Sequence, residues 1–180
     1  IVAETTASPD VILFIDDPAM YAISSGLYSL SPDLIAGKLR EIITMVHDEG
    51  GITGIHCCGN ADWPLLFRTG VDIISFDAFN YLDKVLLYRG EVKEFIHRGG
   101  SLAWGIVPTT GFTGSETADG LVDLLEGGMK LLSDAGIDRS VLLRQCLITP
   151  SCGLGSLQPE QAEAILKLTR EVSYEMQRRL

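Results

Sequence analysis

The chain alternates short apolar runs, rich in β-branched residues, with longer segments in which apolar positions recur every three or four residues. Five of the short runs are predicted strands, namely Val11–Ile15, Ile52–Cys57, Ile73–Phe76, Leu102–Val107 and Gln145–Thr149. They are nearly continuously apolar, which is typical of strands whose sheet is covered by helices. The pattern therefore predicts a parallel sheet in an α/β protein.

Helical periodicity fills the segments between the predicted strands. The clearest helix begins at Ser31-Pro32-Asp33, where a capping hydroxyl precedes a proline at the first helical position and an acid in the first turn. Gly50-Gly51 ends this helix. The other expected helices cover residues 62–69, Leu82 to His97 with an interruption near Gly90, Ser115 or Glu116 to Asp134, and Pro159 to the C-terminus.

This alternation is compatible with two architectures, a doubly wound sheet and a TIM (β/α)₈ barrel. Five strand–helix units are recognisable over residues 1–180, which form one predicted domain, whereas a full barrel has eight units and typically ~250 residues. In the barrel interpretation about three units are absent. The chain, which has no initiator Met, is then expected to be processed or to be the C-terminal part of a longer one. We expect further sequence or self-association to cover the open sheet edges.

Charge and composition narrow the classes of partner. The chain carries a net charge of -10, which repels nucleic acid and anionic lipid. It has no apolar run of the ~18–20 residues that a membrane span needs, and its first residues do not form a secretory signal. Its four cysteines include the adjacent Cys57 and Cys58, an awkward start to a disulfide framework. A cytoplasmic protein with a small-molecule partner is therefore expected.

Residues that can ligate a metal or hold a substrate cluster at the C-terminal ends of the predicted strands. Because these ends lie at one edge of a parallel sheet, we expect their side chains to form one site. The candidates are Asp16, His56, Cys58, Asn60, Asp77, Thr109, Thr110 and Cys152.

His56 and Cys58 are the core of a predicted metal site. They are two residues apart in an extended segment, so both side chains face the same way, whereas Cys57 points to the helical layer as a small buried hydrophobe. Zn²⁺ prefers such nitrogen and sulfur ligands in tetrahedral geometry. Cys152, at the end of another strand, would complete a His-Cys-Cys set, and Asp77 is the natural oxygen ligand or near neighbour. The alternative is that His56 and Cys58 are incidental strand residues.

Asp16 is the candidate for binding the ammonium group of a substrate. It directly follows an apolar strand, where a carboxylate would face the predicted pocket. The alternative is an N-cap, because Asp16 and Asp17 precede Pro18 and such sequences also begin helices.

Four segments resemble, in their order and spatial role, the C-terminal catalytic barrel of cobalamin-independent methionine synthases. The segments are FIDDPAM, IHCCGN, DIISFDAF and TPSCGLG. That family belongs to the uroporphyrinogen-decarboxylase-like barrels, which also contain methylcobamide:coenzyme M methyltransferases. The resemblance covers most of the chain and implies the last five βα units of a TIM-type barrel.

The resemblance also implies residue roles. His56, Cys58 and Cys152 match the family's zinc ligands, and Asp16 matches the carboxylate that binds the amino group of homocysteine. Asp77 falls where the family usually places a glutamate ligand, but it is one methylene shorter, so its bond to zinc could pass through water. Asn60, Thr109 and Thr110 are expected to line the substrate pocket. The segment GIVPTTG lacks the histidine that the long-form enzymes carry there as a proton donor to the folate leaving group.

The function implied is a zinc-dependent methyltransferase that activates the homocysteine thiolate and forms methionine. The methyl donor would be methyl-folate or a methyl-corrinoid protein. Two alternatives remain open: a corrinoid-dependent enzyme acting on another thiol such as coenzyme M, and a catalytically incomplete zinc-binding fragment of a barrel. A metal-free decarboxylase of the same barrel group has no use for the two cysteines.

Overall fold

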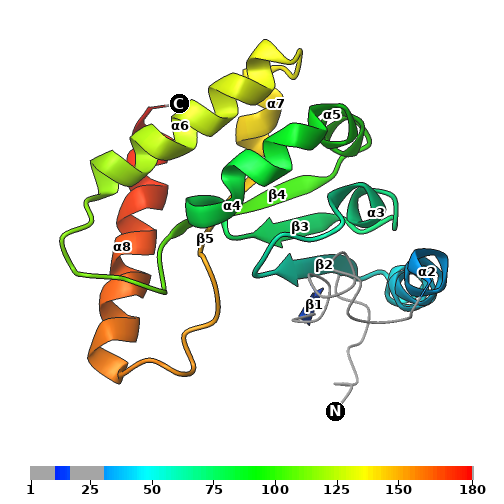
Figure 1. Cartoon of the computed structure of the whole chain (residues 1–180), viewed down its shortest axis with the longest axis horizontal. Coiled ribbons are helices and arrows are strands. Elements are labelled where there is room, and N and C mark those ends of the chain that lie inside the picture. The colour runs from blue at the N-terminus through cyan, green and yellow to red at the C-terminus, as the bar shows by residue number, and fades with distance from the viewer. Residues whose placement is uncertain (1–10, 17–30, 180) are drawn as a thin grey trace.

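Five parallel strands form one sheet in the computed structural model, which describes residues 11–16 and 31–179. They are β1 (Ile12–Asp16), β2 (Ile52–Cys57), β3 (Ile73–Phe76), β4 (Ser101–Val107) and β5 (Cys146–Pro150). The strands pair in chain order, β1-β2-β3-β4-β5 (Figure 1). All five predicted strands are therefore confirmed, each within one residue at its ends.

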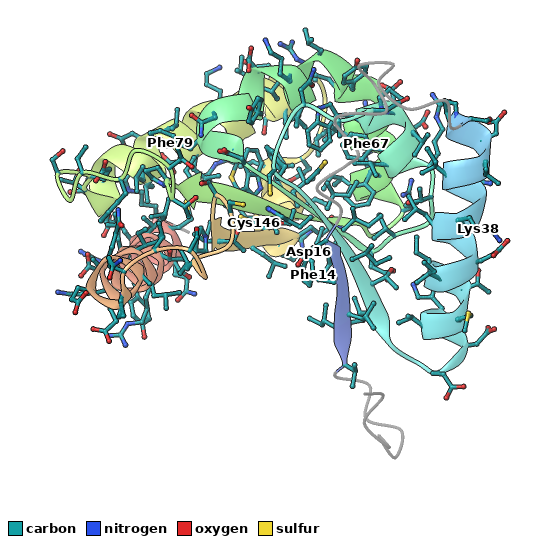
Figure 2. All side chains as sticks on the ribbon, turned by 60° about the horizontal axis from the view of Figure 1, so that its bottom comes forward. Phe14, Asp16, Lys38, Phe67, Phe79 and Cys146 are labelled. Atoms are coloured by element: carbon teal, nitrogen blue, oxygen red, sulfur yellow. The ribbon has the colours of Figure 1, made fainter. Side chains whose placement is uncertain are left out.

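Helices connect the strands and lie on one face of the sheet. They are α2 (Pro32–Asp48), α3 (Trp63–Phe67), α4 (Ala78–Val85), the 3₁₀ turn η1 (Leu86–Tyr88), α5 (Arg89–His97), α6 (Ala118–Asp134), α7 (Arg139–Arg144) and α8 (Pro159–Arg178). Figure 2 shows these helices in an arc around one side of the sheet, from α8 to α2. Right-handed crossovers between strands that follow one another in chain order place every helix on the same face. A doubly wound sheet reverses its order at a switch point, and the described strands do not. The arrangement is consistent with a partial α/β barrel.

The helix starts differ from the prediction for local reasons. Ser31 is the N-cap of α2, but its side chain makes no capping hydrogen bond, so the proline after it is the stronger start signal. The helix expected from Leu82 begins earlier, at Ala78, because the Asp77 carboxylate caps it. Helix α6 begins two residues later than Glu116, after Thr117, whose hydroxyl accepts a hydrogen bond from the Gly120 amide.

The interruption expected near Gly90 is confirmed, because η1 separates α4 from α5 and α5 begins at Arg89. One helix was not predicted. The six-residue α7 was missed because it is too short to show apolar periodicity. Its start does carry a signal, since the Asp138 carboxylate accepts a hydrogen bond from the Ser140 amide.

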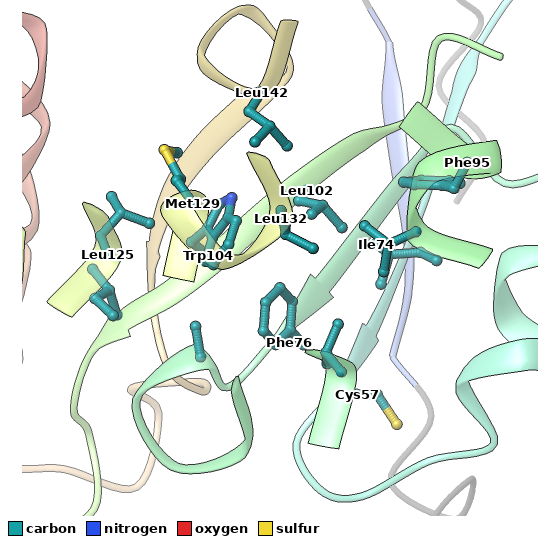
Figure 3. Close-up of a cluster of buried hydrophobic side chains, with 14 of the residues drawn as sticks. Cys57, Ile74, Phe76, Phe95, Leu102, Trp104, Leu125, Met129, Leu132 and Leu142 are labelled. Carbon is teal, nitrogen blue, oxygen red and sulfur yellow. The ribbon is translucent and has the colours of Figure 1, made fainter. Parts of the chain in front are cut away.

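The hydrophobic core lies between the sheet and the helices. Alternate residues of the central strands point into it, including Ile55, Ile74, Phe76, Leu102 and Trp104, all nearly inaccessible to solvent (Figure 3). The rings of Phe76 and Trp104 pack with centroids 5.5 Å apart. Cys57 joins the same layer at 1% exposure, which confirms that it is a small buried hydrophobe.

The edge strands differ from the central ones in exposure. Ile12, Leu13 and Phe14 of β1 and Leu147 of β5 each expose more than a third of their surface. Neither edge pairs with another strand among the described residues, so the described sheet is open. In the same part of the chain, no helix has the length and apolar character needed to cross a bilayer.

Candidate metal centre

The sheet face opposite the helices, here called the inner face, carries the predicted site. In the strand register Asp16 lies beside His56, and His56 lies beside Ser75. Residues paired across parallel strands point to the same face, so these three side chains lie together near the C-terminal ends of β1, β2 and β3. Figure 2 labels Asp16 at the end of β1. Cys57, between His56 and Cys58, points the other way, into the core.

His56, Cys58 and Cys152 converge at this edge. The imidazole Nε2 of His56 lies 3.0 Å from the Cys58 sulfur, which lies 2.9 Å from the Cys152 sulfur. All three ligand atoms are within 4.8 Å of one another, so the group could hold a metal ion. Cys152 follows β5, three strands away from β2 in the sheet, so the two cysteines meet across the sheet edge and not through local sequence.

The chemistry and spacing of these donors fit zinc. One imidazole nitrogen and two thiol sulfurs are soft ligands that Mg²⁺ and Ca²⁺ do not favour. Tetrahedral bonds of ~2.0–2.3 Å would hold two sulfurs about 3.8 Å apart. The two sulfurs, 2.9 Å apart, therefore lie within about 1 Å of the separation that zinc requires, a difference that rotation of the cysteine side chains can supply.

Ser75 orients the imidazole of His56. Its hydroxyl lies 2.9 Å from Nδ1 of His56, so the tautomer with a proton on Nδ1 donates to Ser75 and directs the Nε2 lone pair toward Cys58. Burial lowers the pKa of His56, against the opposing charges of Asp16 and Asp77. The neutral imidazole, the form that binds metals, is therefore favoured. The sequence analysis missed Ser75, although a lone hydroxyl in the apolar run IISF was a usable signal.

The Cys58 thiol is protonated at neutral pH when no cation is near. Partial burial, and then the neighbouring Cys152, raise the pKa of the Cys58 thiol. A thiolate at this position gains most from a positive charge close by, because a bound cation deprotonates its thiol ligands. A metal that binds here must therefore displace the proton of the Cys58 thiol, and its own charge supplies the stabilisation of the thiolate.

Asp77 lies near the three donors but outside their group. Its side chain is buried, with Oδ1 accepting from the Asn80 amide at 2.9 Å and Oδ2 accepting from the Asn80 side chain at 2.7 Å. These bonds make it the N-cap of α4, while its charge still acts on His56. Its predicted role as an oxygen ligand stays a prediction.

The other predicted pocket residues have mixed positions. The Asn60 side-chain oxygen accepts a hydrogen bond from the indole of Trp63 at 3.3 Å, and Thr110 is exposed at the same sheet edge. Thr109 is buried, and its hydroxyl is 3.1 Å from that of Ser151, a residue the sequence analysis did not single out. Its hydroxyl is thus paired with Ser151, and its predicted place in the substrate pocket stays a prediction. The alternative N-cap role of Asp16 depends on Asp17 and Pro18, which lie outside the described residues.

Comparison with known proteins leaves the family of this chain open. No family model and no curated protein matches its sequence. The resemblance to the methionine synthase barrel therefore continues to rest on the four segments quoted above and on the site that they form. The conclusion at this point is chemical: a nitrogen and two sulfurs meet at the C-terminal edge of a parallel sheet.

Proposed function

We propose that this chain is the C-terminal part of a (β/α)₈-type barrel that binds zinc through His56, Cys58 and Cys152 and transfers a methyl group to the thiol of homocysteine. One observation carries the proposal, the convergence of these three donors within 4.8 Å. Their position adds support, because active sites of α/β barrels lie at the C-terminal ends of the strands.

The described residues divide the work of such a site. A bound zinc ion supplies the charge that keeps an acceptor thiol deprotonated at neutral pH. Three protein ligands leave one of four tetrahedral positions for that thiol. The Asp16 carboxylate, beside His56 in the strand register, would bind the ammonium group of homocysteine. The Ser75 hydroxyl can accept from Nδ1 of His56 and so support the tautomer whose Nε2 is free to bind the ion.

Methyl transfer itself needs an electrophilic donor. The acceptor sulfur forms a bond to the methyl carbon while the bond between that carbon and the donor breaks, and the donor keeps the electron pair. A methyl-folate nitrogen must also gain a proton on leaving, whereas a corrinoid cobalt need not. The segment after β4, PTTG, offers no histidine to supply that proton, so a methyl-corrinoid protein is the favoured donor.

The metal content of the purified chain tests the zinc site. The wild type should carry close to one zinc per chain, and Cys58→Ser and Cys152→Ser should each lose it, because removing one of three ligands weakens a tetrahedral site severely. Cys146→Ser is the matched control. Cys146 is the first residue of β5, the strand that leads to Cys152, but it is not one of the three donors. Zinc retained in both Cys58→Ser and Cys152→Ser would rule out this ligand set.

Asp16 distinguishes homocysteine from other thiols. Asp16→Asn should weaken homocysteine binding at least about tenfold, because a charge-assisted hydrogen bond to the ammonium is lost. A thiol without an amine, such as coenzyme M, should bind equally well to both proteins. Titration calorimetry on the zinc-loaded wild type and on zinc-loaded Asp16→Asn measures the affinity for each thiol. Unchanged homocysteine affinity in Asp16→Asn would favour the coenzyme M alternative.

The open edges of the described sheet favour a second candidate, a zinc-binding barrel fragment that is catalytically incomplete. Such a fragment would bind zinc but transfer no methyl group by itself. Methyl transfer assayed on this chain and on its longer reading frame separates the candidates. Activity confined to the longer protein supports the fragment interpretation, and equal activity contradicts it.

A further inference from the structure

A buried hydroxyl pair joins the segments that follow β4 and β5. The Thr109 amide donates to the Ser151 hydroxyl oxygen at 3.0 Å, and the two hydroxyls lie 3.1 Å apart. Both residues are almost fully buried, with Thr109 6% and Ser151 2% exposed. The buried hydroxyl pair is held tightly, because neither hydroxyl can exchange its partner for water unless the surrounding structure opens.

The pair lies where the regular pairing of β4 with β5 ends. The register shifts between Gly105 and Val107, and the Ser151 amide then donates to the Val107 carbonyl oxygen at 2.8 Å. Backbones approach closely there, since a Cβ on Gly105 would lie 2.6 Å from the Phe76 carbonyl oxygen and 2.8 Å from the Cα of Ser151. Ser151 is thus fixed through its amide, its Cα and its hydroxyl.

Cys152 is the next residue after this fixed point. Beyond it, Gly153 and Gly155 have open space where a side chain would lie, and α8 begins only at Pro159. Glycines impose little restriction on the backbone, so the contacts that hold this segment are those of Leu154 and Leu157, which pack against the core. Ser151, which precedes Cys152 directly and is held by its amide and its hydroxyl, is the nearest fixed point to the Cys152 sulfur.

We propose that Ser151 and Thr109 are positioning residues that place the Cys152 sulfur for metal binding. This inference rests on the proposed function, because it assumes that Cys152 is a ligand. It adds to the substrate role predicted for Thr109 a role in building the site. Metal–sulfur bonds tolerate deviations of only about 0.2 Å, so a ligand on an unanchored segment binds more weakly.

Metal affinity of four single variants tests the proposal. Ser151→Ala removes both bonds, and should weaken zinc binding about 10- to 100-fold, the usual cost of losing a partner that supports a ligand. Thr109→Val keeps the bond from its amide, and so should lose less. Thr109→Ser keeps the hydroxyl and should bind as the wild type does. Thr69→Val is the control, because Thr69 is equally buried and its hydroxyl donates to the Leu66 carbonyl oxygen at 2.8 Å, away from the metal centre.

Two readouts separate positioning from general destabilisation. Zinc affinity is measured by competition with a chromogenic chelator, and the stability of each metal-free variant by urea unfolding. Thr69→Val should lose stability with unchanged affinity, while Ser151→Ala should lose affinity beyond what its stability explains. The charge-transfer band of the Co²⁺-loaded protein should also weaken in Ser151→Ala, since it reports thiolate ligation. If Ser151→Ala does not fold, the two Thr109 variants decide, because the proposal requires Thr109→Val to bind zinc more weakly than Thr109→Ser.

The failures are distinguishable. A wild type that binds no metal overturns both the proposed function and this inference. If the wild type binds zinc and both Ser151→Ala and Thr109→Val bind it as tightly as the wild type does, only the positioning role is overturned. Equal losses of affinity in Thr69→Val and Thr109→Val would also overturn it, because the effect would then come from stability alone.

Discussion

At the scale of single residues, the site is built from small side chains and one glycine that no larger residue can replace. The hydroxyl of Ser75 contacts the imidazole of His56. The hydroxyl of Ser151, the residue before Cys152, accepts a hydrogen bond from the Thr109 amide. Gly105 permits the backbones of β3 and β5 to approach β4 at the same edge. These residues carry no metal chemistry of their own, and each lies directly beside one of the elements that bring the three donors together.

Gly105→Ala should destabilise the protein. Its Cβ would press on backbone atoms, which cannot turn aside as a flexible side chain can, so we expect a loss of about 1–3 kcal/mol in the free energy of unfolding. Gly127→Ala is the matched control, because Gly127 lies inside α6 with open space around it. That substitution should stabilise by about 0.5–1 kcal/mol. Urea unfolding measures both, and a Gly105→Ala protein as stable as the wild type would contradict the close approach.

At the scale of elements, polar contacts fix the helices to the sheet at the end opposite the metal centre. The Asp72 carboxylate accepts hydrogen bonds from the amide and hydroxyl of Thr53, at 2.7 and 2.8 Å, and lies 2.7 Å from Nε2 of His47 at the end of α2. One carboxylate thus ties α2 to β2 and to the start of β3. Sequence analysis did not single out this cluster, because its members are far apart in the chain.

Asp72 should make stability depend on pH. Burial alone would raise the pKa of its carboxyl, but the hydrogen bonds from Thr53 and His47 outweigh it and hold the pKa below 3.8. A carboxyl whose pKa is lower in the folded state stabilises the fold above its unfolded pKa of ~3.9 and loses that effect as pH falls through the folded value. Because the side chain is 40% exposed, we expect only about 0.5–1 kcal/mol at pH 7.

Asp72→Asn measures this contribution. Its deficit in unfolding free energy relative to the wild type should be present at pH 7 and shrink as the pH falls below about 4. Asp134→Asn is the control, because Asp134 forms an exposed pair with Lys130 on the surface of α6 and should change stability by less than about 0.5 kcal/mol. Urea unfolding at several pH values gives both curves. A deficit that is the same at pH 7 and pH 3 would contradict the proposed linkage.

At the scale of the whole molecule, the unpaired edges of the described sheet are its most consequential feature. Phe14 on β1 is 43% exposed, and Leu147 on β5 is similarly accessible. An edge strand with exposed apolar side chains is a template for pairing with another strand. Closure of a barrel, by additional units or by a second copy, would cover both edges.

The purified chain should therefore self-associate. Sedimentation velocity over a range of concentrations should show a sedimentation coefficient that rises with concentration. Substituting Phe14 by Lys, which places a charge on the exposed edge, should shift the equilibrium toward the monomer. A wild-type chain that stays monomeric and soluble at all concentrations would contradict this expectation.

The sequence by itself determined the features that depend on local periodicity. The five strands and the α/β class followed from apolar runs, and the opposite orientations of Cys57 and its two neighbours followed from the two-residue repeat of a strand. Local signals were less reliable at helix starts, where the Asp77 cap extended α4 by one turn and the hydroxyl of Ser31 made no cap. Capping depends on side-chain geometry that residue type alone does not fix.

Only the tertiary structure decided which strands are neighbours and which side chains meet. Cys58 and Cys152 are 94 residues apart and come within 2.9 Å through the strand order. The same packing brought the Thr109 hydroxyl next to that of Ser151 and the Ser75 hydroxyl next to Nδ1 of His56. The physical reason is that strand pairing and burial are non-local, because they depend on how whole elements pack against one another. The periodicity of one segment does not specify which other segment it pairs with.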